Sequence, residues 1–101
     1  MLQRNPFMEQ AILCAQNAWK TGDVPGGAVV VQNGKIIGTG WNCREAENRV
    51  IGHAEIMAME EANKGLGSWR LDDCDLYVTL EPCSMCASAI DRKSTRLNSS
   101  H

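Results

Sequence analysis

Apolar residues recur at helical spacing over the first twenty positions of the chain. We expect a helix that begins at Asn5-Pro6, with Asn5 as the N-cap and Pro6 at the first helical position. Gly22 is the expected end of this helix. The apolar face consists of Phe7, Met8, Ala11, Ile12, Ala15, Ala18 and Trp19. We interpret this face as one that packs against a core.

The pattern then changes to short runs of β-branched residues. Residues 28–31 and 35–39 are expected to form two strands, because Asn33-Gly34 between them is the strongest short signal for a β-hairpin. A third strand is expected over residues 75–79.

Two further helices are expected between and after these strands. One covers about residues 54–64 and stops at Gly65, and the other opens at Glu81-Pro82, with proline in its usual first-turn position. Helices that alternate with strands around a hairpin predict an α/β fold in which helices cover a sheet.

Residues 91–101 break the pattern, since they hold one large apolar residue, Leu97, and no periodicity. We therefore expect a domain over residues 1–90, followed by a non-native or disordered tail.

Composition adds limits to this picture. A chain of 101 residues with 44% hydrophobic and 22% charged residues is typical of one globular domain. It contains no apolar run that could span a membrane and no visible secretory signal. Five cysteines without regular spacing do not suggest a disulfide framework, so a cytoplasmic location is expected.

The charge argues against strong non-specific binding of nucleic acid. The formal net charge is −2, and without residues 91–101 seven Lys/Arg stand against eleven Asp/Glu, which gives −4. Any contact with RNA must then come from a local patch, a partner subunit or sequence outside this chain.

The residues with the clearest chemistry are His53, Glu55, Cys83 and Cys86. One His and a CxxC pair supply three zinc ligands, which leaves the fourth position for water and marks a catalytic site rather than a structural one. Glu55 is then placed to move the proton of that water. Because residues two apart do not share a helix face, His53 must lie at or before the first helical turn.

Three other interpretations of these residues remain open. The CxxC could be a redox pair, although that gives His53 and Glu55 no task. A structural zinc site would need a fourth ligand, and Cys74 lies nine residues before Cys83, outside the usual spacing. The chain could also be an inactive, poorly folded fragment.

Several motifs resemble those of the zinc nucleobase deaminases in the cytidine/deoxycytidylate deaminase superfamily, and in particular the tRNA adenosine deaminases. They are His53-Ala54-Glu55-Ile56, Thr79-Leu80-Glu81-Pro82-Cys83-Ser84-Met85-Cys86-Ala87, Asp23-Val24-Pro25, Gly27-Ala28-Val29-Val30-Val31 and Gly40-Trp41-Asn42. The likeness covers residues 6–90. It implies a C-terminally truncated, cytidine deaminase-like three-layer α/β/α fold, with a mixed sheet and a zinc site at two helix N-termini.

The resemblance also implies an activity. It is the hydrolytic deamination of adenosine to inosine at the wobble position of a tRNA anticodon, by a homodimer with one Zn²⁺ per subunit. His53, Cys83 and Cys86 would be the metal ligands, Glu55 the proton shuttle and Asn42 a contact to the target nucleoside in the anticodon stem-loop. A deaminase of free bases or nucleosides, acting on guanine or cytosine, is the alternative.

The chain departs from this family pattern at two positions. Gly26 stands where the family usually has an aliphatic residue beside the substrate pocket, and Ser88 stands where the tRNA enzymes usually have glycine.

Overall fold

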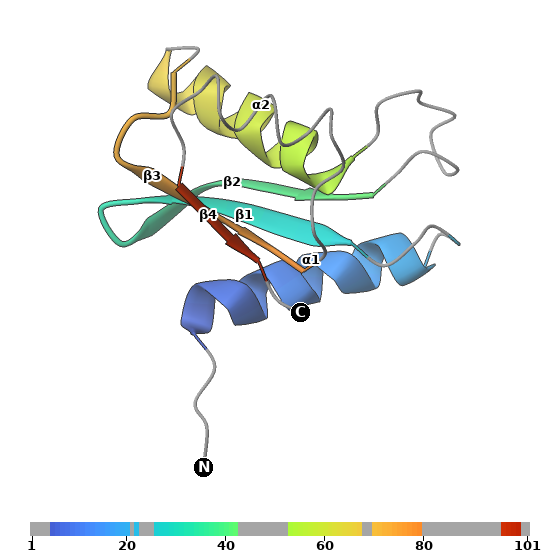
Figure 1. Cartoon of the computed structure of the whole chain (residues 1–101). Helices are drawn as coiled ribbons and strands as arrows, with labels where there is room; N and C mark the ends of the chain where they lie inside the picture. The colour runs from blue at the N-terminus through green and yellow to red at the C-terminus, as the bar shows by residue number, and fades with distance from the viewer. Residues whose placement is uncertain are drawn as a thin grey trace.

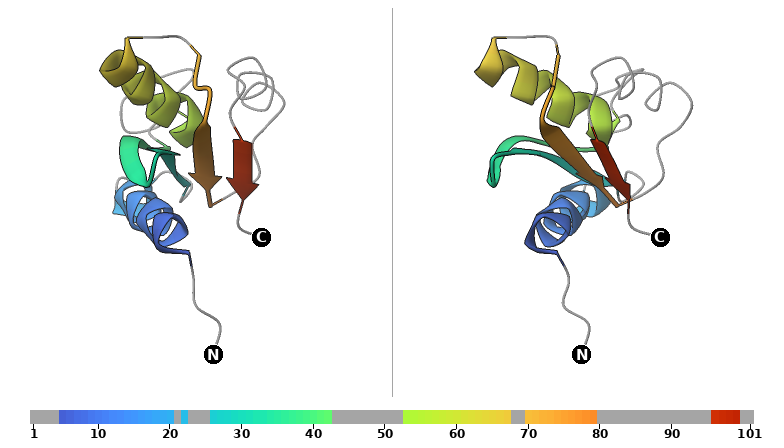
Figure 2. Two further views of the ribbon diagram at one scale, coloured as in Figure 1. Left: turned by 90° about the vertical axis from the view of Figure 1, so that its left-hand side faces the viewer. Right: turned by 60° about the vertical axis from the view of Figure 1, so that its left-hand side comes forward.

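The part of the chain that the structure describes folds around a mixed β-sheet with a helix on each face (Figures 1 and 2). The computed structural model describes residues 5–20, 22, 26–42, 53–67, 70–79 and 96–99. Its elements are α1 (Pro6–Lys20), β1 (Gly27–Gln32), β2 (Lys35–Trp41), α2 (Ala54–Leu66), β3 (Cys74–Val78) and β4 (Arg96–Ser99). The strand order is β2-β1-β3-β4, with β1 antiparallel to both neighbours and β3 parallel to β4. The expected three-layer α/β/α fold is confirmed.

Two local predictions hold at the hairpin and at the start of α1. The Oδ1 atom of Asn5 accepts a hydrogen bond from the Phe7 N–H at 2.8 Å, as an N-cap residue should. Asn33 and Gly34 have φ values of 51° and 78°, as a type I′ hairpin turn requires. The hairpin joins β1 and β2 with Gln32 opposite Lys35.

The packing face of α1 is narrower than the apolar pattern predicts. Ala11, Ala15 and Ala18 are buried, but Trp19 is 72% exposed, so its assignment to the core is wrong. The reason is the close approach of α1 to β1, since a Cβ on Gly27 would collide with the carbonyl oxygen of Ala11. Only small side chains fit where α1 lies so close to β1, and the bulkier side chains of the helix lie beside this contact.

Strand β1 divides the core into two layers by the alternation of its side chains. Val29 and Val31 pack with Ala11 on the α1 face, and Ala28 and Val30 pack on the α2 face. The α2 face carries the larger cluster, whose other buried members are Ala54, Ala58, Met59, Ala62, Leu71, Cys74, Leu76 and Val78. Most of the apolar core therefore lies between the sheet and α2.

The end of α2 differs from the prediction. The helix continues through Gly65 to Leu66, and Gly67 is its C-cap, with φ 67° and its N–H bonded to the Asn63 carbonyl oxygen at 2.8 Å. Gly67 ends the helix because it takes the left-handed conformation that a C-cap needs. The expected stop at Gly65 is therefore wrong.

The C-terminal part of the chain contributes an edge strand. Residues 96–99 pair with β3, and Arg96 forms two hydrogen bonds with the Asp75 carboxylate at 2.9 and 3.2 Å. The expectation of a non-native or disordered tail over residues 91–101 stays a prediction. The helix expected at Glu81-Pro82 lies outside the described residues. Within the part of the chain that the structure describes, no helix is long and apolar enough to cross a membrane.

Candidate active site at the start of helix α2

Four segments of the chain meet at one end of the sheet, where β1 begins and β2 and β3 end (Figure 1). Gly27 and Thr79 join β1 to the end of β3, with the Gly27 N–H donating to Thr79 Oγ1 at 3.0 Å and the Thr79 N–H donating to the Gly27 carbonyl at 3.1 Å. Asn42, directly after β2, donates its N–H to the Gly26 carbonyl at 3.0 Å. Its Oδ1 accepts the Ala54 N–H at 3.0 Å. Helix α2 is thereby tied to the sheet at its first residue.

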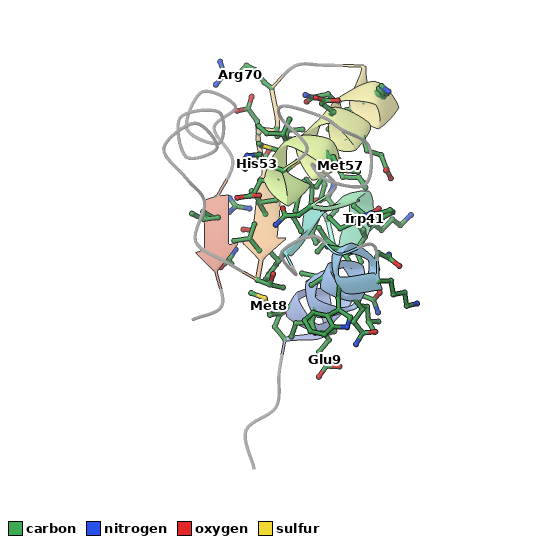
Figure 3. The ribbon with its side chains drawn as sticks, turned by 90° about the vertical axis from the view of Figure 1, so that its right-hand side faces the viewer. Met8, Glu9, Trp41, His53, Met57 and Arg70 are labelled. Atoms are coloured by element: carbon green, nitrogen blue, oxygen red, sulfur yellow. The ribbon has the colours of Figure 1, made fainter. Side chains whose placement is uncertain are left out.

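His53 is the N-cap of α2. Its backbone is extended, with φ −91° and ψ 140°, and its carbonyl accepts the Met57 N–H at 3.1 Å, the first bond of the helix. The prediction that His53 precedes the first turn is confirmed. Its side chain makes no cap hydrogen bond to its own helix. Figure 3 shows His53 on the β3 side of α2, whereas Trp41 at the end of β2 lies on the other side.

Glu55 lies in the first turn of α2 and is 8% exposed. Among the described residues, Glu55 is the charged residue that is buried. The ion pairs found among the described residues, Arg70–Asp72 and Arg96–Asp75, do not include it. A buried carboxylate costs free energy unless it is paired, hydrogen-bonded or near a metal. The N-terminal end of a helix also favours negative charge. Glu55 is therefore a buried carboxylate at the N-terminal end of a helix.

The residues present fit a zinc site in their chemistry. An imidazole and a carboxylate lie together at a helix start, and Cys83 stands four residues after Thr79 in the sequence. Cys83 and Cys86 themselves lie outside the described residues, and the described residues alone contain no cluster of three metal-ligating side chains.

Cys74 does not fit as a fourth zinc ligand. It begins β3 opposite Gln32, at the hairpin end of the sheet, whereas the chain reaches the candidate site at Thr79, directly after β3. Its thiol is buried, and burial raises its pKa, which disfavours the thiolate that zinc binds. Cys74 is a packing residue of the core between the sheet and α2.

Sequence reasoning missed the contact between Asn42 and α2. A side chain that caps a helix from twelve residues away leaves no local pattern, because capping signals extend over only a few residues. It also missed Thr79, whose hydroxyl holds the start of β1.

Comparison with known proteins decides the family. Residues 1–97 match the model of the cytidine and deoxycytidylate deaminase zinc-binding region. The chain belongs to this deaminase family. The matched model describes a zinc-binding region, which agrees with the zinc expected from the sequence.

Curated deaminases of the family are similar over most of this chain. A tRNA-specific adenosine deaminase of Bacillus subtilis is 52% identical over 90 residues, which are 89% of this chain and 56% of the relative. One from Streptococcus pyogenes serotype M18 is 49% identical over 84 residues, which are 83% of this chain and 53% of the relative. The chain thus spans about half the length of these relatives.

Solved deaminase structures share the fold but differ in their substrates. One comes from a study of A-to-I editing by tRNA deaminases at the wobble position of transfer RNA. Its TM-score is 0.85 at 41% identity, covering 94% of this chain and 75% of that one. A guanine deaminase from Bacillus subtilis has a TM-score of 0.86 at 35% identity. The match covers 99% of this chain and 66% of the guanine deaminase chain. The backbone alone therefore does not separate the two substrate classes.

Proposed function

We propose that this deaminase chain carries the zinc-binding part of an enzyme that converts adenosine to inosine at the wobble position of a tRNA anticodon. The observation that carries the proposal is the start of α2, where an extended His53 precedes a buried Glu55. Its support from the comparisons is the 52% identity to a tRNA-specific adenosine deaminase.

The proposed ligands of one Zn²⁺ per subunit are His53, Cys83 and Cys86. Support for this set comes from the chain path. Thr79 lies at the end of the sheet where α2 begins, and His53 is on the β3 side of that helix (Figure 3). Cys83 follows Thr79 by four residues in the sequence, a separation that spans at most about 14 Å. The CxxC spacing is typical of a zinc site.

When bound, zinc supplies a Lewis acid that makes water a nucleophile at neutral pH. Glu55 accepts one proton of the attacking water and delivers it to the ring nitrogen, and it then moves the second proton, from the newly added hydroxyl, to the departing amine. Water adds to the adenine carbon that bears the exocyclic amine, the C–N bond breaks, and ammonia leaves, so adenosine and water become inosine and ammonia. Burial of Glu55 keeps bulk water from competing for these protons.

The proposed substrate is a tRNA anticodon stem-loop, whose target base must be splayed out to enter the pocket. Asn42 lies beside α2 and is the proposed contact to the nucleoside. Because the domain without residues 91–101 has a net charge of −4, we expect the RNA surface to be shared between the two subunits of a homodimer. The proposed location of the enzyme is the cytoplasm.

Deamination of free guanine is the second candidate. The guanine deaminase of Bacillus subtilis matches the backbone as well as the tRNA enzyme does, with TM-scores of 0.86 and 0.85. The lower identity of 35%, against 41% for the tRNA enzyme, favours the tRNA substrate.

The test measures zinc content and product together. Native mass spectrometry of the 101-residue chain should give one zinc, lost in Cys83→Ser, and an anticodon stem-loop should yield inosine. Glu55→Gln should keep zinc and lose more than about 99% of the activity, as expected when a proton shuttle worth 10²–10⁴-fold is removed. Glu60→Gln, an exposed carboxylate on the same helix, is the matched control and should change neither property.

Deamination of guanine in place of the stem-loop would establish the second candidate. A chain without zinc, or one whose activity survives Glu55→Gln, would refute the proposed mechanism.

A further inference from the structure

We propose that Asn42 is a positioning residue that sets the geometry of His53 and Glu55 by capping α2 from the end of β2, and that Gly26 makes the space this requires. The inference rests on the proposed function, because it assumes that His53 binds the metal. It concerns a role of the Asn42 side chain that is separate from contact with a substrate.

The first argument is the hydrogen bonding at the start of α2. The first four N–H groups of a helix have no partner within the helix, and the side chain of the N-cap residue usually supplies one. His53 is the N-cap here, and its side chain makes no such bond. Asn42 Oδ1 accepts the Ala54 N–H instead, at 3.0 Å. The residue proposed as a zinc ligand therefore leaves the capping of its own helix to a residue of another element.

The second argument is that Asn42 is itself fixed. Its N–H donates to the Gly26 carbonyl at 3.0 Å, which holds its backbone against the residue that directly precedes β1. Because Ala54 lies between His53 and Glu55 in sequence, the bond to its N–H acts on the peptide that links the proposed ligand to the helix. A shift of this amide moves both side chains together.

The third argument is the space above Gly26. A Cβ at position 26 would stand 2.6 Å from Asn42 Nδ2, 3.0 Å from Cγ and 3.2 Å from Oδ1. The whole planar amide therefore lies where a side chain at position 26 would project. Since the amide moves as one rigid group, pushing Nδ2 away also withdraws Oδ1 from the Ala54 N–H. The glycine at position 26 is thus coupled to the cap of α2.

The experiment compares Asn42→Ala, Asn42→Asp and Gly26→Ala in the 101-residue chain. The first readout is hydrogen exchange of the Ala54 amide in the metal-free protein, and the second is affinity for Co²⁺ together with its visible absorption spectrum. Asn42→Ala should speed exchange of the Ala54 amide and lower Co²⁺ affinity by about 10–100-fold, the usual effect of losing a group that orients a metal ligand. Asn42→Asp keeps the acceptor oxygen and should retain both properties.

Gly26→Ala should reproduce the effects of Asn42→Ala. In the background of Asn42→Ala it should have no further effect, because the group that it displaces is already gone. Gly65→Ala is the matched glycine control, since a Cβ there would meet nothing within 4 Å. Asn5→Ala removes the cap of the other helix and should leave Co²⁺ affinity unchanged.

The outcomes separate the two proposals. If the unaltered chain binds no Co²⁺, the proposed function fails, and with it the role of Asn42 toward His53. If the chain binds Co²⁺ but Asn42→Ala binds it equally well, only the inference is overturned, and Asn42 merely stabilises the helix. Equal losses in Asn42→Asp and Asn42→Ala would also overturn it, because the aspartate can still cap Ala54.

Discussion

Replacing Gly40 with alanine should push the first turn of α2 away from the sheet and destabilise the chain. Gly40 is buried near the end of β2, directly beneath the helix. A Cβ at this position would collide with the carbonyl oxygen of Ala54 and stand 2.8 Å from both the Ala58 nitrogen and the Met57 Cβ. Ordinary contacts of a Cβ lie at 3.4–4 Å, and these neighbours are mostly backbone atoms that cannot rotate away.

The size of the effect follows from two opposing contributions. Forcing an extra methyl group into a packed interface costs about 1–3 kcal/mol. Alanine regains about 0.5–1 kcal/mol relative to glycine, because the unfolded chain has fewer conformations to lose. A net loss of about 1–2 kcal/mol remains, and a domain of this size loses about 4–8 °C in Tm per kcal/mol. We expect Tm to fall by roughly 10 °C.

Thermal unfolding followed by circular dichroism measures this change. The control is Gly65→Ala in the exposed part of α2, where the added Cβ meets nothing, and it should raise Tm slightly. The reasoning is refuted if Gly40→Ala unfolds at the same temperature as the unaltered chain, since the helix would then have room to move.

Three further substitutions test the packing, the capping and the edge strand. Met59→Ala removes a fully buried side chain and should cost about 2–5 kcal/mol in urea unfolding; a smaller loss would mean that the core collapses around the site. Asn5→Ala removes the acceptor for the Phe7 N–H and should cost about 1 kcal/mol, whereas Asn5→Asp should retain the cap. The Arg96 guanidinium holds the pKa of Asp75 below its usual value, so the stabilisation is present above about pH 4 and is lost as the pH falls further. The difference in Tm between the unaltered chain and Asp75→Asn should therefore shrink in acid, and a constant difference would contradict this.

What the sequence determined by itself is the local structure at several positions and the family to which the chain belongs. Asn5 caps α1, and Asn33-Gly34 closes the hairpin, because each acts on backbone within a few residues of itself. The position of His53 before the first turn of α2 also followed from spacing alone, since residues two apart cannot share a helix face. The motifs around His53 and Cys83 pointed to the deaminase family that the comparison establishes.

What only the tertiary structure decided depends on which distant segments touch. Trp19 repeats at core spacing but is exposed, because α1 meets β1 along a seam that admits only small residues. Gly65 and Gly67 look alike in sequence, and only the backbone conformation shows that the second one ends α2. The bond from Asn42 to Ala54 joins the sheet to α2 across twelve residues. Such contacts are set by packing and strand register, which local periodicity does not encode.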